Sequence, residues 1–263
     1  MNILSKGLLL IGVALSTVAY SQDPVLEAPP VIEAKPDIVT APGRGGKLGM
    51  EAGFGVAANR MDDLKQIQEM ILEMHMEEYQ VDGRVISSFP AYTMASFGIK
   101  KQLNRSVRIG ALYAFSTTGG RSNYTDFTGS LSTDIQATSH RIGAYGSYAV
   151  TGSDRWDLSV YGRLDINYTR VDINTFLYVL GYSNGMVDQY SSVSPNGTAG
   201  VELFYHFNGF SVGLDGGYLV DMQGNLSNKD TGNDLTNPND PQRVMTTDWT
   251  GWRAMAKVLI WLQ

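Results

Sequence analysis

The connections between successive strand-like segments of this chain alternate strictly between long and short. In order, they span residues 60–85, 104–105, 119–136, 151–155, 171–192, 208–209 and 223–245. Two strands that are joined by a turn of a few residues run antiparallel. The alternation therefore predicts eight antiparallel strands, with every short turn at one end of the sheet and every long connection at the other end.

Side chains alternate between apolar and polar along each predicted strand. In residues 47–59 the apolar positions are Leu48, Met50, Ala52, Phe54, Val56 and Ala58. The same alternation recurs in segments 88–101, 106–118, 139–150, 156–170, 198–207, 210–222 and 247–262. A tilted strand needs about 9–11 residues to cross a bilayer, whereas strands of soluble proteins have about 5–6. Because each segment has 10 residues or more, one apolar face per strand is predicted to meet lipid.

Aromatic side chains gather near the ends of these segments. They are Phe89, Trp156, Phe207, Phe210, Trp249 and Trp252. In transmembrane barrels such residues form girdles at the two membrane interfaces. We therefore expect all six to point outward.

The first residues form a secretory signal. Lys6 is followed by the apolar stretch 7–15 and by the small-x-small sequence Ala19-Tyr20-Ser21, which predicts a signal peptide over residues 1–21. Residues 22–45 are rich in proline and predict an extended linker. We expect the barrel to cover residues 46–263, without a peptidoglycan-binding domain after the last strand. An exported barrel indicates the outer membrane of a Gram-negative cell, with both termini periplasmic and the long connections extracellular.

In these features the chain resembles the small eight-stranded outer-membrane β-barrels of the OmpA/OmpX type, which are porin-like proteins. The resemblance covers residues 46–263 and includes the apolar C-terminal strand 252–263, although the chain ends in Trp261-Leu262-Gln263 instead of an aromatic residue. It implies outer-membrane lipid, lipopolysaccharide and the barrel assembly machinery as partners. A secreted soluble β-sandwich is the alternative fold.

Composition excludes several classes of function. The chain has no cysteine, which rules out disulfides, thiolate metal sites and a lipid anchor on cysteine. Its net charge of −6 gives no basic surface for nucleic acid. We expect no cofactor and no metal. Residues 224–243 are rich in Asn and Asp but lack the spacing of a calcium loop; they predict a solvated, mobile loop, and calcium binding there stays open.

The inward faces of the strands collect charged residues. They are Glu51, Arg108, Arg141, Arg163, Asp165, Glu202, Asp215, Arg253 and Lys257. Eight strands enclose only enough space for side chains, and an isolated buried ion costs several kcal/mol. The sequence therefore predicts a charge-paired network that closes the lumen. The alternative is a narrow pore or gated channel whose ion pairs exchange partners.

The first long connection contains the helical pattern of the barrel region. Leu64, Ile67, Ile71 and Met74 recur at spacings of three and four, behind the acidic pair Asp62 and Asp63. This predicts an amphipathic helix of about four turns. Its apolar face, with Met70 added, is a candidate surface for docking a protein partner. A lid that packs on the barrel rim is the alternative.

Two further long connections carry the aromatic residues Tyr124, Phe127, Phe176, Tyr178, Tyr182 and Tyr190. They predict either a contact surface or strands that continue beyond the membrane. A continued strand would offer an unpaired edge to a partner strand. The function predicted from the sequence is accordingly a structural, interaction or adhesion role through the extracellular loops.

Catalysis is the remaining possibility, because lipid-modifying enzymes are built on similar barrels. A hydrolase needs a serine, a histidine and a carboxylate within hydrogen-bonding reach. The histidines are His75, His140 and His206, and the sequence shows no position that collects all three groups. We therefore predict no enzyme, with a lipid hydrolase or acyltransferase as the alternative.

Overall fold

The structure is a computed structural model that describes residues 47–79, 84–87, 89–104, 106–125, 129–179, 182–237 and 240–262. The predicted signal peptide and linker lie outside these residues. All described residues belong to one unit of the chain, Ile38–Gln263. None of the helices in this described part is long and apolar enough to span a membrane.

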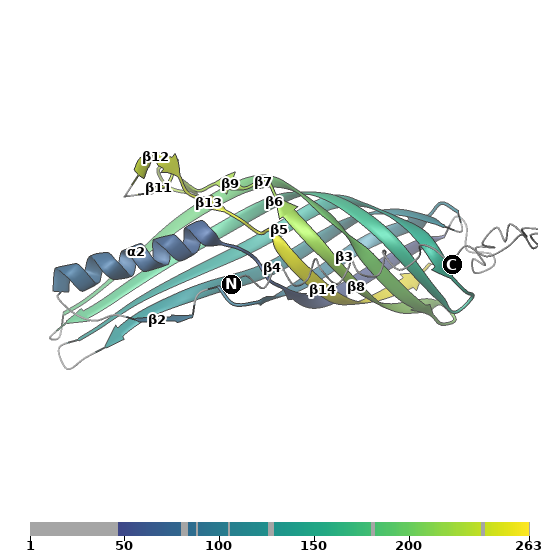
Figure 1. The fold of residues 1–263 in the computed structure, drawn as a ribbon, viewed down its shortest axis with the longest axis horizontal. Coiled ribbons are helices and arrows are strands. Elements are labelled where there is room, and N and C mark those ends of the chain that lie inside the picture. Colours follow the sequence, from purple (N-terminus) through teal and green to yellow (C-terminus); the bar gives the residue numbers. More distant parts are fainter. Residues whose placement is uncertain are drawn as a thin grey trace, which may run out of the picture. The chain divides into compact units, whose positions relative to one another are not determined.

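Eight strands pair into a closed ring (Figure 1). They are β1 (Leu48–Ala57), β3 (Tyr92–Gln102), β4 (Val107–Thr125), β5 (Gly129–Gly152), β6 (Trp156–Val179), β7 (Tyr182–His206), β8 (Phe210–Asp221) and β14 (Gly251–Trp261). Each strand is antiparallel to the next, and β14 returns to pair with β1, placing Gly49 opposite Trp261. The predicted eight-stranded antiparallel barrel is confirmed.

The short turns are built by residues suited to tight reversals. Between β3 and β4, the side-chain oxygen of Asn104 accepts hydrogen bonds from the backbone N–H groups of Ser106 and Val107, both at 2.8 Å. Between β7 and β8, Gly209 has a φ of 91°, a conformation that costs glycine little because it has no Cβ. These local choices fix the antiparallel hairpins on which the barrel depends.

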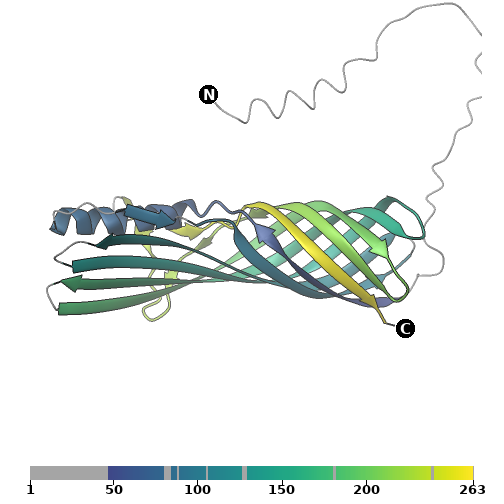
Figure 2. The ribbon, with the colours of Figure 1, turned by 90° about the horizontal axis from the view of Figure 1, so that it is seen from below.

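Two of the predicted long loops are strands. β4 and β5 stay paired up to Thr125 and Ser130, and β6 and β7 up to Val179 and Tyr182. As a result, β4 to β7 contain 19 to 25 residues, whereas β1, β3, β8 and β14 contain 10 to 12. We call residues 117–125, 129–139, 169–179 and 182–192 the four-strand extension (Figure 2). Of the two alternatives predicted for these connections, continued strands are present over the described residues of 119–136 and 171–192. The inner face of the extension is covered from within the chain.

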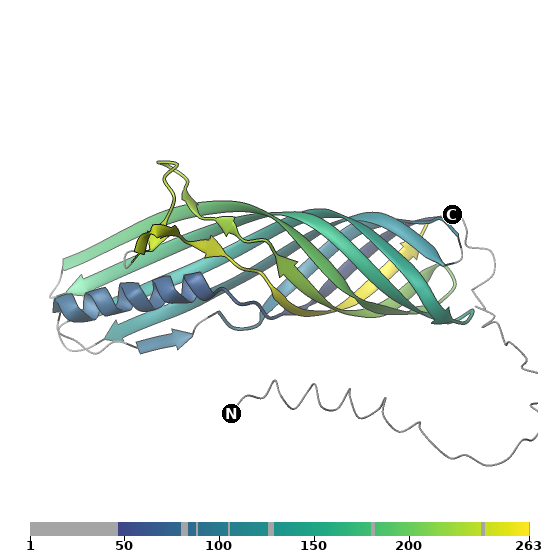
Figure 3. The same ribbon diagram turned by 45° about the horizontal axis from the view of Figure 1, so that its top comes forward.

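The first long connection supplies part of that cover. It contains α2 (Asp62–Tyr79) and β2 (Arg84–Ser87), which pairs with β4. The helix lies along the four-strand extension (Figures 1 and 3). The predicted helix in the first connection is confirmed, and its apolar side chains face the extended strands.

The fourth long connection also packs on the extension. It is divided into β9 (Gly224–Asn225), β10 (Ser227–Asn228), β11 (Thr236–Asn237), β12 (Asp240–Val244) and β13 (Thr246–Thr247). β9 pairs with β13, and β10 pairs with β7. Leu226 and Met245 are fully buried. Most described residues between 229 and 243 are exposed, as predicted for a solvated loop. The short strands were not predicted, and Leu226 and Met245 anchor the segment to the extension.

Side-chain direction within the strands follows the predicted alternation. Leu164, on the outer face, is 74% exposed, whereas its neighbour Arg163, on the inner face, is 4% exposed. Phe89 and Trp249 are exceptions, since both were predicted to point outward and both are buried. β3 begins at Tyr92 and β14 begins at Gly251, so neither residue lies in a strand, and the alternation rule does not apply to them.

Candidate functional site

The lumen of the barrel is the candidate site. The structure places all nine charged residues of the predicted network on its inner face, buried from solvent. Lys100, Asp157 and Tyr145 join them there. The network has a central cluster, a level near the short turns and a level near the long connections.

The central cluster consists of Glu51, Lys100, Glu202, Asp215 and Lys257. The Nζ atom of Lys100 lies 2.6 Å from Glu51 Oε2 and 3.3 Å from Glu202 Oε2. The Nζ atom of Lys257 lies 2.5 Å from Asp215 Oδ2, 3.5 Å from Glu51 Oε1 and 3.6 Å from Glu202 Oε2. Each carboxylate thus has an ammonium partner, which offsets the cost of burying these charges.

Glu202 joins this cluster to the level near the short turns. Besides the two lysines, it pairs with Arg108, whose Nη1 atom lies 3.7 Å from Glu202 Oε1, and it accepts a hydrogen bond from the hydroxyl of Tyr145. Removing this one carboxylate would therefore affect four partners from β3, β4, β5 and β14. Glu202 is the most connected acid of the network.

Lys100 was missing from the predicted network. Its inward direction followed from strand alternation, but its partners lie on β1 and β7. The ammonium also lies 3.8 Å from the centre of the Tyr145 ring, a cation–π contact. Only the pairing register across several strands brings these groups together, and the sequence pattern does not contain that register.

A serine, a histidine and a carboxylate meet at the level near the short turns. His206 Nδ1 lies 2.8 Å from the hydroxyl oxygen of Ser211, and His206 Nε2 lies 2.6 Å from Asp157 Oδ2. The expectation that no such set forms was wrong. His206 and Ser211 face each other across the β7–β8 hairpin, a pairing that inspection of single strands does not reveal.

This chain of hydrogen bonds is closely enclosed. Ser211 is fully buried, and Asp157 also pairs with Arg108 at 2.5 Å. Phe204, Leu259 and Trp261 form a separate buried apolar cluster on the same inner face. His206 therefore serves here as a link between two strands. His140 lies on the outer face and is hydrogen-bonded to the Tyr113 hydroxyl at 2.8 Å, and the side chain of His75 lies outside the described residues.

Three arginines occupy the level near the long connections. Arg163 pairs with Asp165, Arg141 donates to the hydroxyl of Ser116 at 3.1 Å, and Arg253 donates to the hydroxyl of Tyr161 at 3.1 Å. Neither Arg141 nor Arg253 has a carboxylate within ion-pair distance among the described residues. We call Arg141, Arg163 and Arg253, with Asp165 and Asn196, the arginine cluster.

Gly143 makes room for the acid of this cluster. A Cβ atom at this position would collide with Asp165 Oδ1 and with the backbone oxygen of Leu164. We expect Gly143→Ala to displace the Asp165 carboxylate from Arg163 and to destabilise the barrel by about 1–3 kcal/mol. Urea unfolding followed by circular dichroism measures this loss. Gly146→Ala is the matched control on the same strand, because a Cβ there would meet nothing within 4 Å; an equal loss in both variants would contradict the steric explanation.

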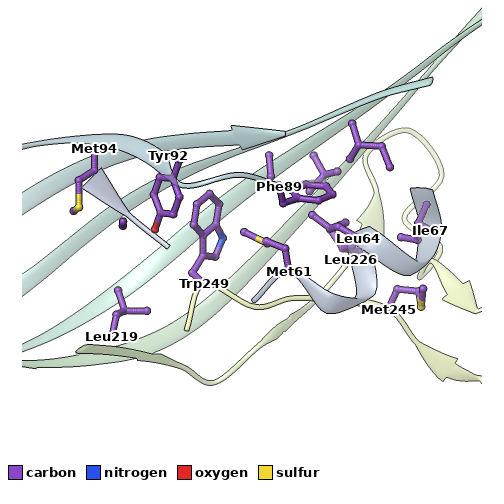
Figure 4. Close-up of a cluster of buried hydrophobic side chains, with 14 of the residues drawn as sticks. Met61, Leu64, Ile67, Phe89, Tyr92, Met94, Leu219, Leu226, Met245 and Trp249 are labelled. Carbon is purple, nitrogen blue, oxygen red and sulfur yellow. The ribbon is translucent and has the colours of Figure 1, made fainter. Parts of the chain in front are cut away.

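An apolar cap covers the lumen on the side of the long connections (Figure 4). It contains Met61, Leu64, Ile67, Phe89, Leu226, Met245 and Trp249, all of them buried. The indole N–H of Trp249 donates to Thr169 Oγ1 at 2.9 Å, and the indole ring packs edge-on against Tyr92 with 5.3 Å between centroids. Segments from the first and fourth connections thus meet over the arginine cluster.

The helix face that was predicted to dock a partner is largely used by this cap. Leu64 and Ile67 are buried in it, and Met70 and Ile71 pack against it. Met74 alone of the five predicted docking residues is mainly exposed, at 58%. Docking through Leu64 and Ile67 is therefore contradicted, because their side chains already cover the barrel.

Asp63 fastens the helix to the fourth connection. Its carboxylate accepts hydrogen bonds from the backbone N–H and the hydroxyl of Thr246, both at 2.9 Å, and pairs with Arg243. We expect Asp63→Ala to free the fourth connection and to raise its cleavage rate by an added protease several-fold. Asp62→Ala is the matched control, since Asp62 is exposed and pairs only with Lys65. Equal cleavage of the two variants would show that Asp63 does not hold the connection.

Among the described residues, no group of three or more His, Asp or Glu side chains is arranged to hold a metal ion. The Asn and Asp side chains of the fourth connection instead bond within it. For example, Asn228 Oδ1 accepts from the backbone N–H groups of Asp230 and Thr231, both at 3.0 Å.

No known protein family and no curated protein matches the sequence. Solved structures do match the fold. One is the attachment invasion locus protein Ail of Yersinia pestis, with 11% identity, 82% of this chain and 98% of that chain covered, and a TM-score of 0.38. A second is Neisserial surface protein A, with 11% identity, coverage of 83% and 98%, and a TM-score of 0.41. A third is the outer membrane protein OprG from Pseudomonas aeruginosa, with 14% identity, coverage of 86% and 99%, and a TM-score of 0.42. These similarities are low, and the barrel assignment rests on the strand pairing of the chain itself.

Proposed function

We propose that this protein is an outer-membrane barrel with a closed lumen that acts through its four-strand extension as an interaction surface. The observation that carries the proposal is the difference in length between the two halves of the wall. β4 to β7 continue well past the strands that complete the barrel. A wall that only crossed a membrane would not need this extra length.

The outer surface supports the membrane location. Large apolar side chains are exposed on all eight strands, among them Phe54, Ile142, Leu164, Val201 and Leu214. Monomeric soluble proteins rarely expose a contiguous apolar surface of this kind. By the usual sidedness of such barrels, the short turns would be periplasmic and the extension extracellular. Fractionation and heat-modifiable gel migration test this placement, and recovery in the soluble fraction would refute it.

The tip of the β6–β7 hairpin is the best candidate contact surface. Phe176, Tyr178, Tyr182, Met186 and Val187 are all exposed there. Strand pairing puts Met186 opposite Thr175 on one face and Val187 opposite Asn174 on the other face, so both faces carry apolar side chains. Such residues outside a bilayer favour a protein partner.

The edge of β7 gives that partner a mode of binding. β10 covers β7 only at Tyr190 and Ser191, so within the described residues the edge at 182–188 has no strand beside it. An unpaired edge offers backbone N–H and C=O groups to an added strand. We therefore propose an extended segment of a protein partner as the ligand.

The test compares two triple variants in capture experiments from intact cells. Changing Phe176, Tyr178 and Val187 to Ser should reduce capture of the partner at least ten-fold, while the barrel keeps its heat-modifiable migration. Changing Asn174, Ser183 and Asn184 to Ala at the same tip is the control and should leave capture unchanged. Equal capture by both variants would show that the tip of the β6–β7 hairpin does not bind the partner.

A gated channel is the second candidate function. The specific observation in its favour is that Lys257 faces the three carboxylates of Glu51, Glu202 and Asp215 within 3.6 Å, so its ion pairs can exchange. Planar bilayers separate the candidates. A closed barrel gives no steady conductance, and a gated channel gives voltage-dependent steps that Lys257→Met changes.

A lipid hydrolase is the third candidate, supported by the hydrogen-bonded set Asp157, His206 and Ser211. The hydroxyl of Ser211 would have to become accessible for an acyl group to reach it. Mass spectrometry of lipid A and phospholipids after expression in a host that lacks such enzymes tests this function. A change that persists in Ser211→Ala would exclude this serine as the nucleophile.

A further inference from the structure

We propose that the arginine cluster binds a small inorganic anion inside the barrel. Three guanidinium groups meet there, and Arg141 interacts electrostatically with Arg163, Arg253 and Asp165. Of these, only Arg163 and Asp165 form an ion pair. A guanidinium keeps its proton in proteins, so the excess positive charge cannot be removed by deprotonation.

The two neighbouring carboxylates, Asp215 and Asp221, have other contacts at short range. Asp215 pairs with Lys257 at 2.5 Å. Asp221 accepts hydrogen bonds from the Ser194 hydroxyl at 2.6 Å and from the backbone N–H of Trp249 at 3.1 Å. Neither acid forms an ion pair with an arginine. Within the cluster, the three arginines thus have one ion-paired carboxylate, Asp165, and Asp215 acts on Arg253 only at longer range.

Unused donors in the cluster point to a ligand. The Nε atom of Arg141, the Nη2 atom of Arg163, and the Nε and Nη1 atoms of Arg253 are buried without hydrogen-bond partners. The side-chain amide of Asn196 is equally buried and equally unpartnered. These residues come from β5, β6, β7 and β14 and surround one level of the lumen. Leaving buried charged donors unsatisfied is unfavourable, so a species that accepts their hydrogen bonds would stabilise the barrel.

The chemistry of the donors defines the ligand. Guanidinium and amide N–H groups bind chloride and oxyanions such as phosphate, and paired N–H groups of arginine match two oxyanion oxygens. The single acid of the cluster, Asp165, is held by Arg163. The apolar cap lies over the same level and buries it from solvent. The site therefore suits a small inorganic anion.

Thermal unfolding at constant ionic strength tests the proposal. The barrel, refolded in lipid vesicles, is melted while potassium gluconate is replaced in steps by potassium chloride or potassium phosphate, with circular dichroism as the readout. Gluconate is larger than chloride and phosphate and serves as the reference anion. We expect the unfolding midpoint to rise and then saturate with chloride or phosphate. A midpoint that does not change, or one that rises linearly without saturation, would overturn the proposal.

Two kinds of lumen arginine provide the matched variants. Arg141→Gln and Arg253→Gln should abolish the anion-dependent rise. Arg108→Gln should keep that rise although its basal midpoint is lower, because Arg108 already has Asp157 and Glu202 as partners. An equal rise in all three variants would show that the anion acts outside the cluster.

A direct measurement covers the case in which the arginine variants do not fold. Crystals of the parent grown with bromide in place of chloride should show an anomalous signal beside Arg253 and Asn196. Asn196→Leu, which removes an unpartnered amide, should weaken that signal. Parent crystals without a signal in the lumen would refute the site.

Discussion

Replacing Glu202 with alanine is expected to destabilise the barrel by about 3–5 kcal/mol, the usual cost of removing one partner from a buried ion cluster. Lys100, Lys257 and Arg108 would each lose a carboxylate, and the Tyr145 hydroxyl would lose its acceptor. Urea unfolding from lipid vesicles, followed by circular dichroism, gives the change in free energy.

Two controls separate charge from shape and from position. Glu202→Gln keeps the volume and should recover part of the hydrogen bonding but not the ion pairs, so its stability should lie between those of the parent and the alanine variant. Arg121→Ala breaks an exposed pair with Asp134 and should have little effect, since surface ion pairs contribute little. A Glu202→Ala barrel as stable as the parent would show that the network does not hold the wall together.

Replacing Trp249 with alanine is expected to cost about 3–5 kcal/mol, because the apolar cap would lose its largest side chain and keep much of the cavity. Trp249 is 1% exposed and touches segments that are distant in the sequence. The same change should let an added protease cut the first and fourth connections faster. Unfolding by circular dichroism and gel analysis of the fragments measure both effects.

Trp252 offers the matched control only three residues away. Its ring is 69% exposed on the outer face and packs edge-on against Tyr218. Trp252→Ala removes the same side chain without opening the cap, so it should destabilise much less and leave the connections resistant to protease. If Trp249→Ala and Trp252→Ala lose the same free energy of unfolding, a tryptophan in the cap stabilises the barrel no more than one on the outer surface.

Strand alternation was the part of the structure that the sequence predicted well. Alternation is a local property, and the opposite directions of Arg163 and Leu164 follow from it directly. The same reasoning failed for Phe89 and Trp249, whose places depend on how the connections pack over the lumen. Local patterns therefore predict which face of a strand a residue occupies, but not whether the residue lies in the strand.

The contacts of the site could not be predicted in the same way. The inward direction of Lys100 and His206 follows from strand alternation. The meeting of Lys100 with Glu51, or of His206 with Ser211 and Asp157, depends on the register between strands. Similarly, the polar composition of the fourth connection did not reveal its short strands, which Leu226 and Met245 anchor to the extension. Pairing and packing involve residues that are far apart in the sequence, and a single sequence does not record them.

The pairing of β1 with β14 has a consequence for how the barrel is made. All the other neighbours in the ring are consecutive strands of the ring, whereas this seam joins its first and last strands. Bringing such distant segments together carries the largest loop-closure entropy of any pair in the ring. Hairpins such as β5–β6 can form early because a short turn joins their strands. The β1–β14 seam should therefore form last.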